Sequence, residues 1–182
     1  AFASGIVPSE VVALANSARD RAELPALTEN AQLSQAARAK AEDMIKNDYF
    51  SHTSPKGIEP WYWIKQAGYQ YQAAGENLAI NYTNAEDQHE AWMKSATHRA
   101  NILNTRYQEI GVAVVKGKVN GKESIVTVEM FGSPLHAVVD RVAVVPPVAV
   151  PVSEIKGVEA PVVSPVSPAP VSSPVVVLPV VI

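Results

Sequence analysis

Several short stretches of this sequence combine a titratable side chain with aromatic or turn residues, which makes them costlier to bury than an ordinary core segment. They are YFSHTSP (49–55), GENLA (75–79), AWMKSATHRANIL (91–103), YQEIGVAVV (107–115) and VEMFG (128–132). The third stretch has the apolar residues of a packed helix, yet His98 and Arg99 stand together near its end. Imidazole, carboxylate and hydroxyl groups can act in acid–base catalysis, nucleophilic catalysis or metal binding. For Arg99 the simpler expectation is an ion pair with a nearby carboxylate.

Two catalytic motifs can be tested on these residues. Ser95 precedes His98 by three residues, and Glu76 could orient that imidazole as the acid of a catalytic triad does. No serine lies in a G-x-S-x-G elbow, however, and a small polar residue also suits a helix end. His89 and Glu90 begin like the zinc-protease motif H-E-x-x-H, but position 93 is methionine, so this motif fails. A serine hydrolase therefore stays an alternative without a local motif.

The composition excludes several classes of protein. The chain of 182 residues carries 15 Lys and Arg against 18 Asp and Glu, which leaves no basic surface of the kind that binds nucleic acid. It has no cysteine, which excludes disulfides, cysteine nucleophiles and thiolate metal sites. No stretch reaches the roughly 18 consecutive apolar residues of a membrane-spanning helix. We expect a monomer with no nucleic-acid partner.

The chain divides into a short N-terminal segment, a domain and a tail. Ala1-Phe2-Ala3 matches the small-x-small pattern of a signal-peptidase site, so residues 1–7 are interpreted as an N-terminal segment with a candidate signal-peptide remnant. The domain is expected at 8–136. The tail, 137–182, holds 18 Val and 9 Pro, a composition that favours an extended backbone. We interpret the tail as a linker or stalk, with envelope attachment through it as a further hypothesis.

Helix signals dominate the first part of the domain. Ser9 is a candidate N-cap for a helix to about Glu23, and Asn30 is one for a helix to about Asn47. A short helix is expected between Pro60 and Gly68, because proline suits the first turn and glycine the end. Asn84 is expected to cap a helix that ends near Ser95.

Strand signals dominate the rest. EIGVAVVKG (109–117) and ESIVTVEMFG (123–132) flank Asn120-Gly121, a dipeptide typical of a tight β-hairpin. ENLAINY (76–82) is expected to form a third strand. Helices around a small antiparallel sheet predict a three-layer α/β/α sandwich, with an extended Val/Pro-rich C-terminal tail.

The stretch PWYWIKQAGYQY (60–71) concentrates aromatic residues. We expect Trp61 and Ile64 in the core. The excess of aromatic side chains could edge a groove for a sugar or a lipid, because exposed aromatic rings often mark binding surfaces.

In their order and spacing, YFSHTSP, GENLA, AWMKSATHRANIL and YQEIGVAVV with VEMFG resemble the CAP superfamily, also called the SCP/PR-1-like or cysteine-rich secretory protein family. The resemblance covers about 10–133 and is closest to the bacterial, cysteine-free branch. It implies the α/β/α sandwich and a cleft in which His52, Glu76 and His98 converge, with Ser95, Arg99 and Asn77 as candidate supporting residues. Many eukaryotic members have a second glutamate three residues after a helix tryptophan. Here that tryptophan corresponds to Trp92, and Ser95 takes the place of the glutamate.

The resemblance leaves two hypotheses for function. The first is an exported bacterial protein, secreted or associated with the cell envelope, that binds a lipid, glycan or peptide in the cleft without catalysis. The second is a metal-dependent hydrolase or peptidase at the cell envelope. His52, His98 and Glu76 are the candidate ligands of Zn²⁺ or another divalent metal, whose fourth position could hold an activated water. The structural alternative is that the three residues form a hydrogen-bonded polar cluster that holds helix and loop together.

Overall fold

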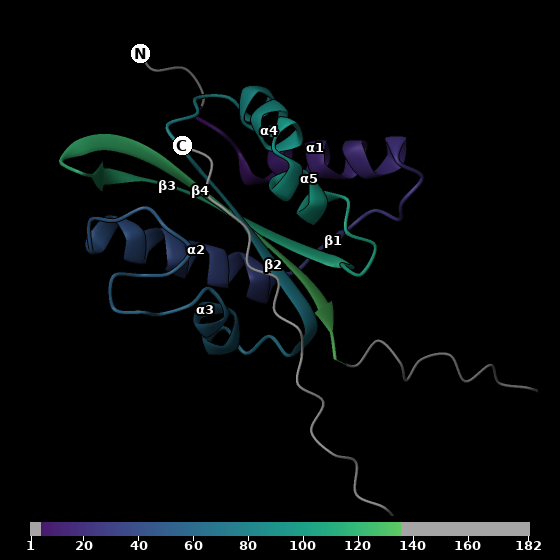
Figure 1. Cartoon of the computed structure of the whole chain (residues 1–182), viewed down its shortest axis with the longest axis horizontal. Helices are drawn as coiled ribbons and strands as arrows, with labels where there is room; N and C mark the ends of the chain where they lie inside the picture. Colours follow the sequence, from purple (N-terminus) through teal and green to yellow (C-terminus); the bar gives the residue numbers. More distant parts are fainter. Residues whose placement is uncertain (1–4, 136–182) are drawn as a thin grey trace, which may run out of the picture.

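A central sheet lies between two layers of helices in the computed structural model, which describes residues 5–135 (Figure 1). α2 and α3 cover one face of the sheet, and α1, α4 and α5 cover the other. This arrangement confirms the three-layer α/β/α sandwich. The elements in chain order are α1 (Pro8–Arg21), β1 (Thr28–Glu29), α2 (Ala31–Lys46), α3 (Trp61–Gln66), β2 (Tyr71–Ile80), α4 (Ala85–Lys94), α5 (Ala96–Ile102), β3 (Glu109–Val119) and β4 (Lys122–Pro134).

The sheet has the strand order β1-β3-β4-β2. β3 and β4 form the predicted hairpin, and Asn120 and Gly121 at its tip both have positive φ, 53° and 73°. β2 pairs antiparallel with β4, as expected. β1 was not predicted and pairs parallel with β3 through Thr28 and Glu29, so the sheet is mixed. Two residues are too few to produce the alternation by which a strand is recognised.

The third long strand is displaced from its predicted position. It begins at Tyr71 rather than at Glu76 and ends at Ile80, because Asn81 takes a left-handed backbone with φ 65°. Its first half reads YQAAG, in which alanine and glycine have little intrinsic preference for strands. Pairing with β4 supplies the stability that local sequence does not.

The helix caps are mostly as predicted. The Asn30 side chain accepts hydrogen bonds from two amides of α2, and the Asn84 side chain accepts one from Asp87 N at 2.8 Å. The predicted cap Ser9 is wrong: α1 begins at Pro8, after Val7, and has no side-chain cap. Proline has no N–H, so one of the amides that a first helical turn otherwise leaves unpaired is absent here.

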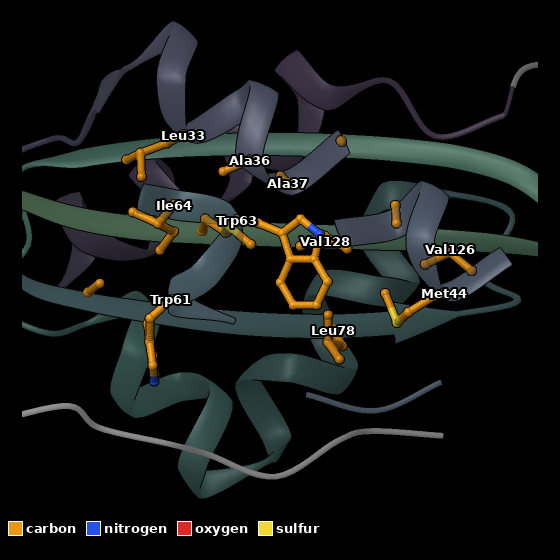
Figure 2. Close-up of a cluster of buried hydrophobic side chains, with 14 of the residues drawn as sticks. Leu33, Ala36, Ala37, Met44, Trp61, Trp63, Ile64, Leu78, Val126 and Val128 are labelled. Carbon is orange, nitrogen blue, oxygen red and sulfur yellow. The ribbon is translucent and has the colours of Figure 1, made fainter. Parts of the chain in front are cut away.

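Each face of the sheet has its own apolar core. The core under α2 and α3 includes Leu33, Leu78 and Val128, and Figure 2 shows the Trp63 indole in the middle of these side chains. The core under α1, α4 and α5 includes Trp92 and Phe131.

Most of the aromatic residues of the 60–71 stretch are structural. Trp61 and Ile64 are buried as predicted, and so are Trp63 and Tyr69, whereas Tyr62 is 49% exposed. The aromatic-groove hypothesis therefore has one well-exposed ring to build on. Within 5–135 no helix is both long and apolar enough to span a bilayer. The candidate signal-peptide remnant at 1–3 and the tail at 137–182 lie outside the described residues.

Candidate functional site

β2 places a carboxylate at the border between the two helical layers. Side chains alternate along a strand, so Glu76 lies on the same face as Ala74 and Leu78, which belong to the core under α2 and α3. Asn77 points to the opposite face. Because β2 is an edge strand of the sheet, residues from both layers can meet beside it.

His52 and Glu76 form a hydrogen-bonded pair. The His52 Nδ1 atom lies 2.6 Å from Glu76 Oε1, and both side chains are buried. With Glu76 ionised, its oxygen accepts, so Nδ1 carries the proton and Nε2 the free lone pair. Burial raises the pKa of Glu76, while the His52 hydrogen bond and the charge of Lys40 oppose that rise. His52 Nε2 and Glu76 Oε2 have no hydrogen-bond partner within residues 5–135.

A buried lysine holds the loop that carries His52. Lys40 Nζ donates to the His52 carbonyl at 2.6 Å and to Tyr49 OH at 3.3 Å. It also lies 4.3 Å from the centre of the Trp63 ring, so its third N–H has an aromatic face nearby. The pKa of Lys40 is lowered overall. Burial is the main cause, and the charge of Glu76 opposes it in part.

Sequence reasoning missed Lys40, although a signal was present. The buried positions of α2 include Leu33, Ala36, Ala37 and Met44, and Lys40 stands on that same stripe. A lysine on the buried face of a helix requires a partner, which is a reason to look for one.

His98 reaches the site from the other helical layer. It lies in α5, is 1% exposed, and its Nδ1 atom is 2.7 Å from Ser95 Oγ. Burial, and to a lesser extent the electrostatic effect of His52, lowers the pKa of His98 to about 4, so His98 is neutral at physiological pH. Its Nε2 atom, like that of His52, has no partner within 5–135.

The candidate supporting residues Asn77 and Arg99 differ in burial and in hydrogen-bond partners. Asn77 donates to the His98 carbonyl at 3.3 Å and to Glu129 Oε2 at 2.9 Å, so it links α5 to the sheet. Arg99 is exposed and donates to the carbonyl of Met93 at 2.8 Å. Within 5–135 Arg99 takes part in none of the ion pairs, so the expected pairing is not found among these residues.

The geometry bears on both catalytic hypotheses. Ser95 contacts His98 as a nucleophile and base would, but the bond between Glu76 and His52 assigns the carboxylate to the other imidazole. The triad of Ser95, His98 and Glu76 is therefore not assembled. Within 5–135 no three His, Asp or Glu side chains are grouped as a metal site. Among the three predicted ligands, the donor atoms without a partner within 5–135 are the two imidazole Nε2 atoms and Glu76 Oε2.

Glu129 is a further residue that sequence reasoning did not single out. It lies on β4 opposite Asn77, is fully buried, and keeps one carboxylate oxygen without a partner within 5–135. Burial raises the pKa of Glu129 to about 8, and the hydrogen bond from Asn77 partly opposes this rise. A glutamate at an inward position of an apolar strand was the available signal.

Comparison with known families gives one match over most of the chain. The family model of the Cysteine-rich secretory protein family, CAP, matches residues 12–131. The Bacillus subtilis protein YkwD is 41% identical over 107 residues, which cover 59% of this chain and 42% of YkwD. The Bacillus subtilis membrane protein YlbC is 33% identical over 105 residues, which cover 58% of this chain and 30% of YlbC. The chain thus spans less than half the length of either relative.

Solved structures share the fold. An extracellular SCP-domain protein of Bacillus anthracis is similar with a TM-score of 0.59 and 30% identity, over 69% of this chain and 39% of that protein. An outer surface protein of Borrelia burgdorferi is similar with a TM-score of 0.60 and 21% identity, over 69% of this chain and 91% of that protein. At the lower identity the likeness shows the fold alone.

Proposed function

This chain belongs to the cysteine-rich secretory protein family, CAP, and on that premise we propose that it is an extracellular ligand-binding module. The extracellular description of the Bacillus anthracis protein supports the location. The proposed polar contacts for the ligand are the side chains of His52 and His98, here called the imidazole pair. Glu76 orients the ring of His52.

One observation carries this proposal: both imidazoles keep an unpartnered, buried Nε2 atom. A buried polar atom without a partner costs roughly 1–3 kcal/mol, so a ligand that supplies the missing hydrogen bonds gains that free energy back on binding. Glu76 and Ser95 already fix the two Nδ1 atoms, so both rings are oriented before a ligand arrives. The His52 loop lies outside the helices and strands, and its local opening is the expected route of entry.

The ligand class follows from the protonation of the two rings. His52 Nε2 accepts, because its Nδ1 carries the proton. His98 Nε2 donates if Ser95 O–H donates to Nδ1, an orientation favoured when Thr97 in turn donates to Ser95 Oγ, which lies 3.2 Å away. An acceptor beside a donor suits an uncharged polar group such as the hydroxyl of a lipid or glycan, or a peptide amide.

A metal-dependent hydrolase is the second candidate, and one contact favours it. A carboxylate on the far nitrogen of a histidine is the arrangement that orients metal-ligating imidazoles. His52 Nε2 and His98 Nε2 would hold a Zn²⁺ ion, whose chemistry is the activation of a bound water. The two imidazoles are fewer than the three protein ligands of ordinary catalytic zinc sites, so Glu76 Oε2, water or substrate would supply the remainder.

The test is a pair of titrations on the full chain. Binding to lipid vesicles, to envelope glycans and to peptides is measured for the wild type and for the His52→Ala/His98→Ala double variant. Arg99→Ala is the matched control, because Arg99 is an exposed neighbour of His98. Loss of binding in the double variant with retention in Arg99→Ala supports the module; equal binding by all three proteins would exclude the imidazole pair.

Zinc calorimetry on the same three proteins separates the second candidate. Micromolar binding by the wild type and Arg99→Ala, absent from the double variant, supports a metal site and justifies hydrolysis assays. No heat of binding from a folded wild-type protein removes the metal hypothesis and leaves the binding module in place.

A further inference from the structure

The free edge of β2 is covered by side chains rather than by another strand. Its carbonyls at positions 74, 76 and 78 accept hydrogen bonds from Tyr107 OH at 3.1 Å, Asn101 Nδ2 at 3.1 Å and Trp92 Nε1 at 3.1 Å. Two of these three donors also take part in a buried chain of polar groups behind the site.

Four side chains form the buried chain, here called the asparagine network: Asn77, Asn101, Tyr107 and Glu129. Glu129 Oε2 accepts from Asn77 Nδ2 at 2.9 Å, and Asn77 Oδ1 accepts from Asn101 Nδ2 at 2.9 Å. Tyr107 OH reaches Asn101 Oδ1 at 3.4 Å. Gly75 makes room for it, because a Cβ at that position would collide with the Tyr107 ring and hydroxyl.

The asparagine network donates hydrogen bonds to the main chain at two residues of the candidate site, Glu76 on β2 and His98 on α5. Asn101 Nδ2 donates to the carbonyl of Glu76, and Asn77 Nδ2 donates to the carbonyl of His98 at 3.3 Å. The two asparagines bond to each other. The relative position of Glu76, on the sheet, and His98, on α5, is therefore fixed by two linked amides.

Glu129 is the end of the asparagine network that lies on an inner strand of the sheet. It comes from β4, in register with Asn77 on β2 and Val112 on β3, so its backbone is held on both sides. Its carboxyl group is the acceptor that orients the Asn77 amide. Without it, the Asn77 Nδ2 group could turn away from the His98 carbonyl.

We propose that Glu129 is a positioning residue of the imidazole pair, acting through Asn77 and Asn101 to hold His98 in a fixed place relative to Glu76 and His52. The role matters for binding only if the imidazole pair is the ligand site proposed above. The geometric claim itself does not depend on that function.

Glu129 can fill this role as a neutral carboxyl group. The raised pKa of Glu129, about 8, leaves its carboxyl group mostly protonated at neutral pH. A glutamine has the same shape and keeps a carbonyl oxygen to accept from Asn77. Glutamine should therefore replace Glu129 without disturbing the network, whereas leucine removes the acceptor.

The experiment compares Glu129→Gln, Glu129→Leu and Asn77→Ala in the full chain, with Thr127→Val as control. Thr127 is buried on the same face of β4, two residues from Glu129. Nitrogen–proton correlation spectra report the tautomer and environment of each imidazole, and circular dichroism confirms folding. We expect shifted His98 signals in Glu129→Leu and Asn77→Ala, and unchanged signals in Glu129→Gln and Thr127→Val.

Two outcomes overturn the proposal: unchanged His98 signals in Asn77→Ala, or signals altered as much by Glu129→Gln as by Asn77→Ala. Unchanged His98 signals in a folded Glu129→Leu overturn it as well; if that variant fails to fold, the comparison of Glu129→Gln with Asn77→Ala decides. Zinc ion serves as a separate probe, with about a tenfold or greater loss of affinity expected in Asn77→Ala. If the wild type binds no zinc and no ligand, the proposed function fails while the imidazole spectra still decide the positioning role.

Discussion

His52 and His98 are the same residue type, yet their Nδ1 partners give them different chemistry. An ionised Glu76 would make His52 Nε2 an acceptor, whereas the neutral hydroxyl of Ser95 can either donate to His98 Nδ1 or accept from it. The sequence predicts that both histidines belong to one site through the family resemblance. It could not predict which imidazole receives the carboxylate, because that depends on a 2.6 Å contact between a loop and a strand.

The buried carboxyl group of Glu129 should make stability depend on pH. Its pKa is about 8 in the folded protein against 4.5 ordinarily, so between these values the folded state holds a proton that the unfolded state has released. The resulting stability is fully present below pH 4.5 and is lost as the pH rises through about 8. We expect the free energy of unfolding to fall more steeply in the wild type than in Glu129→Gln from about pH 5 to about pH 9. Urea unfolding at each pH measures it; parallel curves would contradict the assignment.

Lys40→Met should destabilise the protein and loosen the His52 loop. The substitution keeps an unbranched apolar stem but leaves the His52 carbonyl without its donor. Hydrogen bonds to charged groups contribute about 1.5–3 kcal/mol each, so we expect a loss of about 2–3 kcal/mol in the free energy of unfolding. Lys46→Met, exposed on the same helix, should change it by less than about 0.5 kcal/mol. Similar losses in both variants would show that Lys40 has no special role.

Helices and strands were predicted correctly where a turn or cap residue marks their ends, and were missed or misplaced where no such residue does. The Asn120-Gly121 turn and the Asn30 and Asn84 caps act through their own neighbours, so sequence alone identifies them. The start of β2 and the whole of β1 depend on strands far away in sequence. Their residues have no local preference that would reveal them.

Trp92 joins α4 to the edge of β2 and should be sensitive to both size and hydrogen bonding. Trp92→Ala removes a side chain that is 1% exposed and should lower the free energy of unfolding by about 3–5 kcal/mol. Trp92→Phe keeps a large aromatic ring but leaves the Leu78 carbonyl unpaired, which should cost about 1–3 kcal/mol. Denaturant titrations measure both variants, and Tyr62→Ala, exposed in α3, is the control. A Trp92→Ala protein as stable as the wild type would be incompatible with this packing.

Over the whole molecule, the candidate site exists because two helical layers meet at one sheet edge. His52 lies in the segment between α2 and α3, His98 lies in α5, and Glu76 lies in β2. The spacing of His52, Glu76 and His98 along the chain could not predict that they lie together, because each is more than twenty residues from the next. The family resemblance supplied it, and Lys40, Glu129 and Asn101 emerged from the structure.

The last prediction concerns the tail. The two apolar cores, the imidazole pair and the asparagine network are all built from residues within 5–135. A chain that ends at residue 136 should therefore keep the thermal midpoint of the full chain and its affinity for zinc or for the ligand. Binding to whole envelope material is the contrasting measurement, because the hypothesis of attachment through 137–182 expects this binding to weaken on truncation. Loss of zinc or ligand affinity in the shortened chain would place part of the site in the tail. Undiminished envelope binding would instead assign attachment to the domain itself.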